Sequence, residues 1–123
     1  MNDIALNDIS FFGLVNLEQL DLSFNSIPHL NANIFKHLAN LKYLNLMSCK
    51  ITSVDLTTFS GLLNVKELNL SKNSIEEMSA EHFRDLISLD KLNLYSNPFI
   101  YRQDIVGFYK QLNLNDLNLI IDD

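Results

Sequence analysis

The sequence predicts a right-handed solenoid of the α/β class, with a parallel β-sheet on its concave side and short helices or irregular segments on its convex side. Three observations lead to this prediction. The 123 residues include 23 Leu and 16 Asn, and the Leu residues recur in one pattern every 24 positions. Apolar and polar residues alternate at the start of each unit, as in a half-buried strand. A unit this short buries its apolar side only by stacking on neighbouring units.

The repeated pattern is Leu-x-x-Leu-x-Leu, with Val at the first position of one copy. It begins at Leu17, Leu41, Val65 and Leu89, and a fifth copy at Leu114 follows after 25 residues. Further apolar positions keep this register, namely Ile27, Ile51, Ile75 and Phe99; Phe35, Phe59 and Phe83; and Leu38, Leu62 and Leu86. So many positions in phase predict one continuous core shared by successive coils.

The repeat predicts a single domain over residues 1–123, with repeats starting at 17, 41, 65 and 89 and a last strand at about 114–121. Residues 1–16 form a partial repeat, because their apolar pattern falls one unit before that of the first full repeat. The matching pairs are Leu6 with Leu30, Phe11 with Phe35 and Leu14 with Leu38, and Met1 takes the position of Asn25. We therefore expect the chain to be part of a longer protein.

A polar residue recurs eight positions into the units, at Asn25, Cys49, Asn73 and Asn97. An Asn in a tight turn satisfies backbone groups of its own coil and of the next one, and buried backbone groups require such partners. We therefore predict a structural ladder along the stack. Cys49 replaces Asn in this ladder as a small weak donor, whereas a nucleophilic thiol would need exposure and an electropositive partner.

The fourth unit departs from the repeat after Asn97-Pro98-Phe99. Beyond it, Ile105, Phe108, Tyr109 and Leu112 are spaced as on one face of a helix, and Asp104 is placed to cap its first turn. We expect this helix to close the stack before the last strand. Among the residues that follow, Asp122 and Asp123 place charge at the end of that strand, which makes its edge less prone to pairing.

Composition excludes several classes of function. The net charge of −6 argues against nucleic acid as a partner, because phosphate binding needs clustered Lys and Arg. The apolar runs are too short to cross a bilayer, and one Cys allows no internal disulfide. Phosphate-binding, metalloprotease and serine-hydrolase motifs are all missing. The histidines His29, His37 and His82 share no row of the stack. We expect no enzyme activity, no cofactor and no metal.

The repeat resembles the leucine-rich repeat family, in the 24-residue class with a Phe in the second half of each unit. This class is common in the ectodomains of Toll-like receptors and small proteoglycans. The resemblance implies non-catalytic recognition of another protein by part of an extracellular or cell-surface protein. Two alternatives stay open. The segment after Asn97 is similar to the cysteine-free cap of some intracellular members, which would make the chain an intracellular scaffold or adaptor. The open ends of the solenoid would also allow self-association in a structural or assembly role.

Any recognition surface is expected on the outward face of the strands. Tyr43, Met47 and Tyr95 are large side chains on a mostly polar face, and such residues anchor interfaces. A polar row runs beside them, formed by Asp21, Asn45, Asn69, Asn93 and, in the fifth copy, Asn118. This row is suited to a polar ligand. Alternatively it is ordinary filler, with neighbouring amides bonded to one another across the strands.

Overall fold

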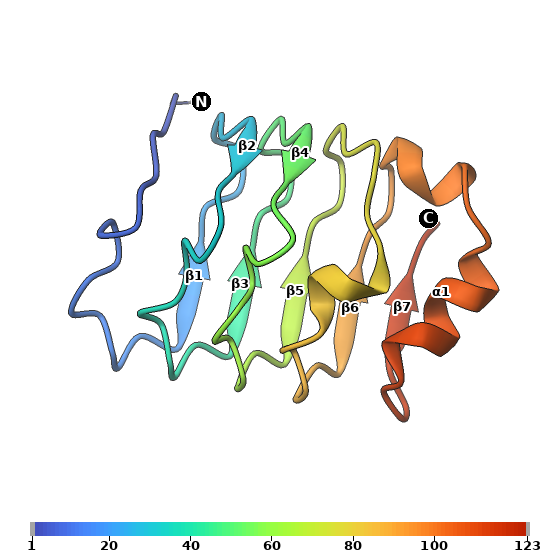
Figure 1. Ribbon diagram of the computed structural model, residues 1–123. Helices are drawn as coiled ribbons and strands as arrows, with labels where there is room; N and C mark the ends of the chain where they lie inside the picture. Colours follow the sequence, from blue (N-terminus) through green and yellow to red (C-terminus); the bar gives the residue numbers. More distant parts are fainter. Residues whose placement is uncertain (1, 123) are drawn as a thin grey trace.

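The computed structural model describes residues 2–122, so Met1 and Asp123, the ends of the expected domain, lie outside the described residues. Successive coils stack side by side into a solenoid, and each contributes one strand to a parallel sheet (Figure 1). The strands follow the order β1 (Gln19–Asp21), β3 (Tyr43–Asn45), β5 (Glu67–Asn69), β6 (Lys91–Asn93) and β7 (Asn118–Ile120). The predicted fold class is confirmed.

The first four strands pair in the register that the 24-residue repeat predicts. Leu20, Leu44, Leu68 and Leu92 are successive partners, and all four point toward the core. Pairing continues past the strand ends, since the Leu22 N–H donates to the Asn45 carbonyl at 2.9 Å. Register is strongly specified here because a shift by one residue would turn every inward Leu to solvent.

The last strand is shorter than predicted, and its register is shifted by two residues. The fifth copy of the repeat aligned Leu117 with Leu92, but Leu92 pairs with Leu119. The segment before β7 contains a turn in which Asn113 and Asp116 adopt positive φ, and this turn uses the additional residues. A shift by two residues keeps the same side chains on the same face, so Leu119 still points inward.

A second, two-stranded sheet was not predicted. It pairs β2 (His29–Leu30) with β4 (Ser53–Val54) in parallel, at the upper margin of the stack in Figure 1. Near this margin, residues 2–4 extend the pairing to the N-terminal segment, because the Ile4 N–H donates to the Ser26 carbonyl at 2.9 Å. The N-terminal segment therefore does pair with the first full coil, although it contributes no strand to the main sheet.

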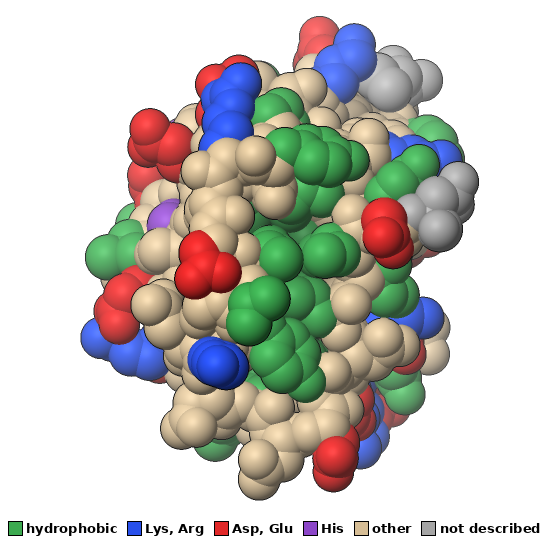
Figure 2. Space-filling model, turned by 90° about the vertical axis from the view of Figure 1, so that its right-hand side faces the viewer, with side chains coloured by type: hydrophobic (Ala, Val, Ile, Leu, Met, Phe, Trp, Pro, Cys, Tyr) green, Lys and Arg blue, Asp and Glu red, His purple; other side chains and the backbone are tan. Residues whose placement is uncertain are grey.

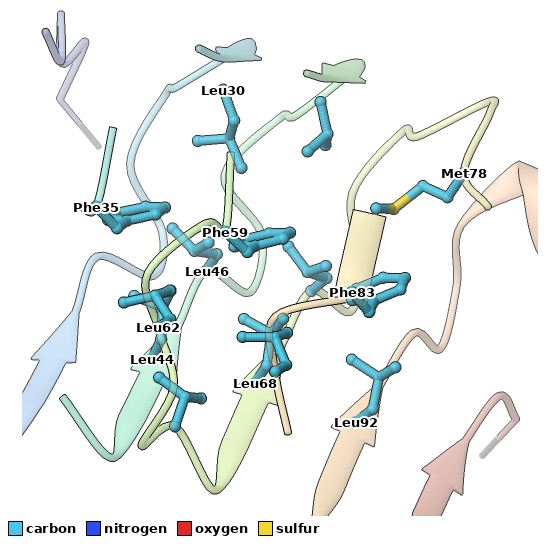
Figure 3. Packing of buried hydrophobic residues seen from close by; sticks show 14 of the residues in the cluster. Leu30, Phe35, Leu44, Leu46, Phe59, Leu62, Leu68, Met78, Phe83 and Leu92 are labelled. Carbon is cyan, nitrogen blue, oxygen red and sulfur yellow. The ribbon is translucent and has the colours of Figure 1, made fainter. Parts of the chain in front are cut away.

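A column of stacked phenylalanine rings runs through the core. Ring centroids lie 5.7 Å apart for Phe11 and Phe35, 6.2 Å for Phe35 and Phe59, and 6.0 Å for Phe59 and Phe83. Figure 3 shows Phe35, Phe59 and Phe83 in a row from left to right, with the strand leucines Leu44, Leu68 and Leu92 below them. Leu14 is 46% exposed, unlike its equivalent Leu38, because no described coil packs on its outer side.

Turns form the convex side of the first coils, and short helices form that of the later ones. The 3₁₀ segments η1 (Ala80–Phe83) and η2 (Pro98–Tyr101) precede α1 (Ile105–Leu112), whose bounds match the predicted helix. Asp104 caps α1 as predicted, because its Oδ1 accepts the Gly107 N–H at 3.0 Å. Phe108 completes the ring column by packing edge-on against Phe83. Figure 2 shows this end of the molecule, where apolar side chains of α1 and β7 gather.

Candidate binding site on the concave face

The outward side chains of the sheet form three rows that cross the strands. The first row contains Gln19, Tyr43, Glu67, Lys91 and Asn118, and the second row contains Asp21, Asn45, Asn69, Asn93 and Ile120. Two residues further along each coil, the third row contains Ser23, Met47, Ser71 and Tyr95. The register shift in β7 places Asn118 in the first row, so its predicted position beside Asn93 was wrong.

A shallow groove of about 260 Å³ lies over the first and second rows. Its lining brings together Asp21, Asn45, Asn69 and Asn93, and Tyr43 stands beside them with 39% of its surface exposed. Met47 and Tyr95 are less exposed than predicted, and Ser71 between them is buried. The chain bends immediately after this row, where Ser48, Lys72 and Ser96 adopt positive φ, and the bend draws the third row inward.

Every polar side chain of the second row uses one oxygen in a local turn. The backbone N–H two residues later donates to it, at 2.9 Å for Asp21, 3.0 Å for Asn45, 2.9 Å for Asn69 and 3.1 Å for Asn93. If the row had only a structural role, its side-chain amides would be expected to hydrogen-bond to one another across the strands. No such hydrogen bonds occur among the described residues of this row. The Ser23 hydroxyl and N–H beside Asp21 also lower the pKa of that carboxyl.

The ladder residues lie behind the groove and face the core. Asn73 accepts the N–H groups of Cys49 (2.8 Å) and Ile51 (3.1 Å), and its amide donates to the carbonyls of Leu46 and Leu70, both at 2.9 Å. Asn97 accepts the Ile75 N–H and donates to the Leu70 carbonyl. These side chains join adjacent coils through their backbones and are not available to a ligand.

Cys49 and Asn25 occupy the same ladder near the N-terminal end. The Cys49 Sγ lies 3.0 Å from the Leu22 carbonyl, to which it donates, and Asn25 donates to that carbonyl at 2.9 Å. The Cys49 side chain is buried, and burial raises the pKa of its thiol. The thiolate, which is the nucleophilic form, is therefore disfavoured in the folded protein.

We expect Cys49 to react with a thiol reagent about three orders of magnitude more slowly than free cysteine, because opening a core site costs about 4–5 kcal/mol. The rate at which Ellman's reagent releases its coloured product at pH 8 measures the reaction rate of the Cys49 thiol. The matched control carries Cys49→Ala together with Ser74→Cys, which moves the thiol to an exposed position and restores fast reaction. Equal rates for the two proteins would show that Cys49 is accessible.

Several of the remaining titratable side chains link neighbouring coils. His82 accepts the Ser79 N–H at Nδ1 (3.1 Å), and its Nε2 lies 3.1 Å from the Val54 carbonyl. Arg102 pairs with Glu76 at 2.8 Å. Within residues 2–122, no group of three His, Cys, Asp or Glu side chains is placed to hold a metal ion. No helix in this range is long and apolar enough to cross a membrane.

Comparison with known proteins identifies the family. The family model described as leucine rich repeat matches residues 4–51 and 41–99, which is more than half of the chain. The chain therefore belongs to the leucine-rich repeat family, which typically provides non-enzymatic recognition modules. No curated protein matches the sequence.

Two complexes are among the solved structures that are similar to the chain. The crystal structure of the TLR13–ssRNA13 complex is 30% identical over 96% of this chain, with a TM-score of 0.85. The structure of the Drosophila Toll–Spatzle complex is 23% identical over 68% of this chain, with a TM-score of 0.49. The chain spans only 17% and 14% of those two proteins. The TLR13 structure is a complex with an RNA, so the similarity gives no support to the expectation that nucleic acid is excluded.

Proposed function

We propose that the chain is a non-catalytic protein-recognition module in an extracellular or cell-surface leucine-rich repeat protein, and that its concave face binds the partner. The observation that carries this proposal is the groove over the first and second rows, in which an exposed Tyr43 stands beside unused amide donors. A concave site with one aromatic anchor and a few placed polar groups is the usual form of a recognition surface.

The charges of the groove suit a protein partner better than a polyanion. Asp21 and Glu67 contribute two negative charges, and Lys91 contributes the one positive charge in the groove lining. A phosphate backbone would need several converging cations. The similarity to the TLR13–ssRNA13 complex nevertheless makes RNA the alternative that the experiment has to exclude.

We expect the double substitution Tyr43→Ala and Tyr95→Ala to weaken partner binding by about 10–100-fold, since truncating the two Tyr side chains together costs about 1.4–2.8 kcal/mol. Clones selected from a display library of small folded domains supply partners whose affinities for both proteins are measured. The control is Leu56→Ala with Tyr101→Ala, two exposed side chains outside the groove. Equal melting temperatures would show that both variants fold.

Two results would contradict this proposal. Clones that bind both double variants as tightly as the parent chain would place recognition elsewhere on the molecule. Saturable binding of a labelled single-stranded RNA, displaced by those clones and lost with Tyr43→Ala, would instead make the concave face a nucleic-acid site.

The intracellular scaffold and the assembly role are distinguished by other measurements. An upstream signal peptide with flanking cysteine clusters in the full transcript would exclude the intracellular alternative. The assembly alternative requires a mass that rises with concentration in light scattering, and a constant monomer mass would exclude it.

A further inference from the structure

The second row offers a ligand three amide donors, and the oxygens of its Asn side chains are already in use within the protein. The Oδ1 atoms of Asn45, Asn69 and Asn93 already accept backbone N–H groups, and Asn69 Oδ1 also accepts the Ser71 hydroxyl at 2.6 Å. Their Nδ2 groups have no protein acceptor among the described residues. Within residues 2–122, Gln103 Nε2 is the one buried side-chain polar atom that has no hydrogen-bond partner. The three unpartnered Nδ2 atoms are therefore not buried, and they are exposed in the groove.

The spacing of these donors is set by the sheet. Neighbouring strands lie about 4.8 Å apart, so Asn45 and Asn93, which are two strands apart, are separated by about 9.6 Å. A polyproline II helix has three residues per turn and rises about 3.1 Å per residue, so carbonyls on one of its faces recur about every 9.3 Å. A segment in this conformation that crosses the strands would bring successive turns to Asn45 and Asn93.

The chemistry of such a segment matches the row. Proline has a carbonyl acceptor and no N–H donor, and polyproline II leaves its carbonyls without internal partners. A β-strand would also bring N–H groups, whereas each Asn oxygen of this row already accepts a backbone N–H, and an α-helix has already used its carbonyls. Aromatic side chains are the usual contacts of proline rings, and Tyr43 and Tyr95 stand on opposite sides of the row.

The charge of the groove lining indicates which charge the bound segment would carry. Asp21 and Glu67 outnumber Lys91, so an acidic segment is disfavoured and a neutral or weakly basic one is accepted. We propose that the concave groove binds a proline-rich segment of the partner in the polyproline II conformation, with carbonyls on one of its faces accepting from the amides of Asn45 and Asn93. This inference rests on the proposed protein-recognition function and names the chemistry of the bound segment.

The test uses a fluorescein-labelled decaproline as the probe and fluorescence anisotropy as the readout. We expect saturable binding by the parent chain and binding weakened at least about tenfold by Asn45→Asp or Asn93→Asp, because an acceptor replaces the donor. Asp retains the oxygen that accepts the N–H two residues later. Asp21 makes this same turn in the parent chain, so the variants are expected to fold.

Asn115→Asp is the matched control, since it adds the same charge at an exposed position outside the groove. A Gly/Ser peptide of equal length with the same label is the control probe, and we expect it not to bind. The inference is overturned if decaproline does not bind, if the Gly/Ser peptide binds equally, or if Asn115→Asp weakens binding as much as Asn93→Asp. Library clones that require Tyr43 while decaproline fails would leave the proposed function standing and remove only this inference.

Discussion

Replacing Phe59 with alanine is expected to lower the free energy of unfolding by about 3–5 kcal/mol. The ring is 1% exposed and lies between two others, with centroids 6.2 Å from Phe35 and 6.0 Å from Phe83. The three rings are nearly parallel, at interplanar angles of 2° and 12°. The truncation therefore removes packing from three coils at once and leaves a cavity in the middle of the stack.

Urea unfolding followed by circular dichroism measures this change. Phe59→Leu is the control that keeps an apolar side chain of intermediate size at this site, and it is expected to cost less than Phe59→Ala. Phe11→Ala is the positional control, because Phe11 has one ring neighbour and its coil is only partial. We expect it to cost less than Phe59→Ala. Equal losses at the two positions would show that the column does not act as a shared core.

The repeat predicts the register of the first four strands because inward leucines have to meet inward leucines. It does not predict β7, because there the turn between α1 and the strand decides the register. That turn is defined by positive φ at Asn113 and Asp116, two polar residues whose sequence pattern does not fix how many residues the turn uses. The alternation of apolar and polar residues predicts that Leu119 faces the core. It does not predict the residue of β6 with which Leu119 pairs.

The outward face of the candidate site is also predictable from alternation, but the free atoms on it are not. Asn45 and Asn93 read equally well as filler or as ligand-binding residues, since either role needs the same side chain at the same place. The structure adds that the local turns use Oδ1 and leave Nδ2 without a protein partner among the described residues. The partial burial of Met47 and Tyr95 likewise depends on the backbone bend after the third row, which the sequence pattern does not reveal.

The ladder connects the fold to the site. Asn69 and Asn73 lie on the same coil four residues apart, one facing the groove and one facing the core. Amides at the ladder positions fix the backbone of each turn, and the same turns hold the groove amides in place. We therefore expect that loosening the ladder disturbs the groove, while substitutions of the groove amides leave the ladder intact.

Asn73→Ala is expected to lower the free energy of unfolding by about 3–4 kcal/mol. It leaves the N–H groups of Cys49 and Ile51 without an acceptor inside the protein, and each unpaired buried group costs about 1–3 kcal/mol. It also removes donors from the carbonyls of Leu46 and Leu70. Because these groups belong to two adjacent coils, water entry at one coil loosens its contact with the next.

Asn25→Ala is the matched comparison for this substitution, since Asn25 is only partly buried and, among residues 2–122, its side chain donates only to carbonyls of its own coil. Its loss is expected to be about 1 kcal/mol, because a carbonyl near the surface regains water. The difference between the two variants, measured by urea unfolding, therefore reports the links between coils separately from the turn itself. If Asn73→Ala costs no more than Asn25→Ala, the ladder does not join the coils, and the leucine and phenylalanine packing alone would hold the stack together.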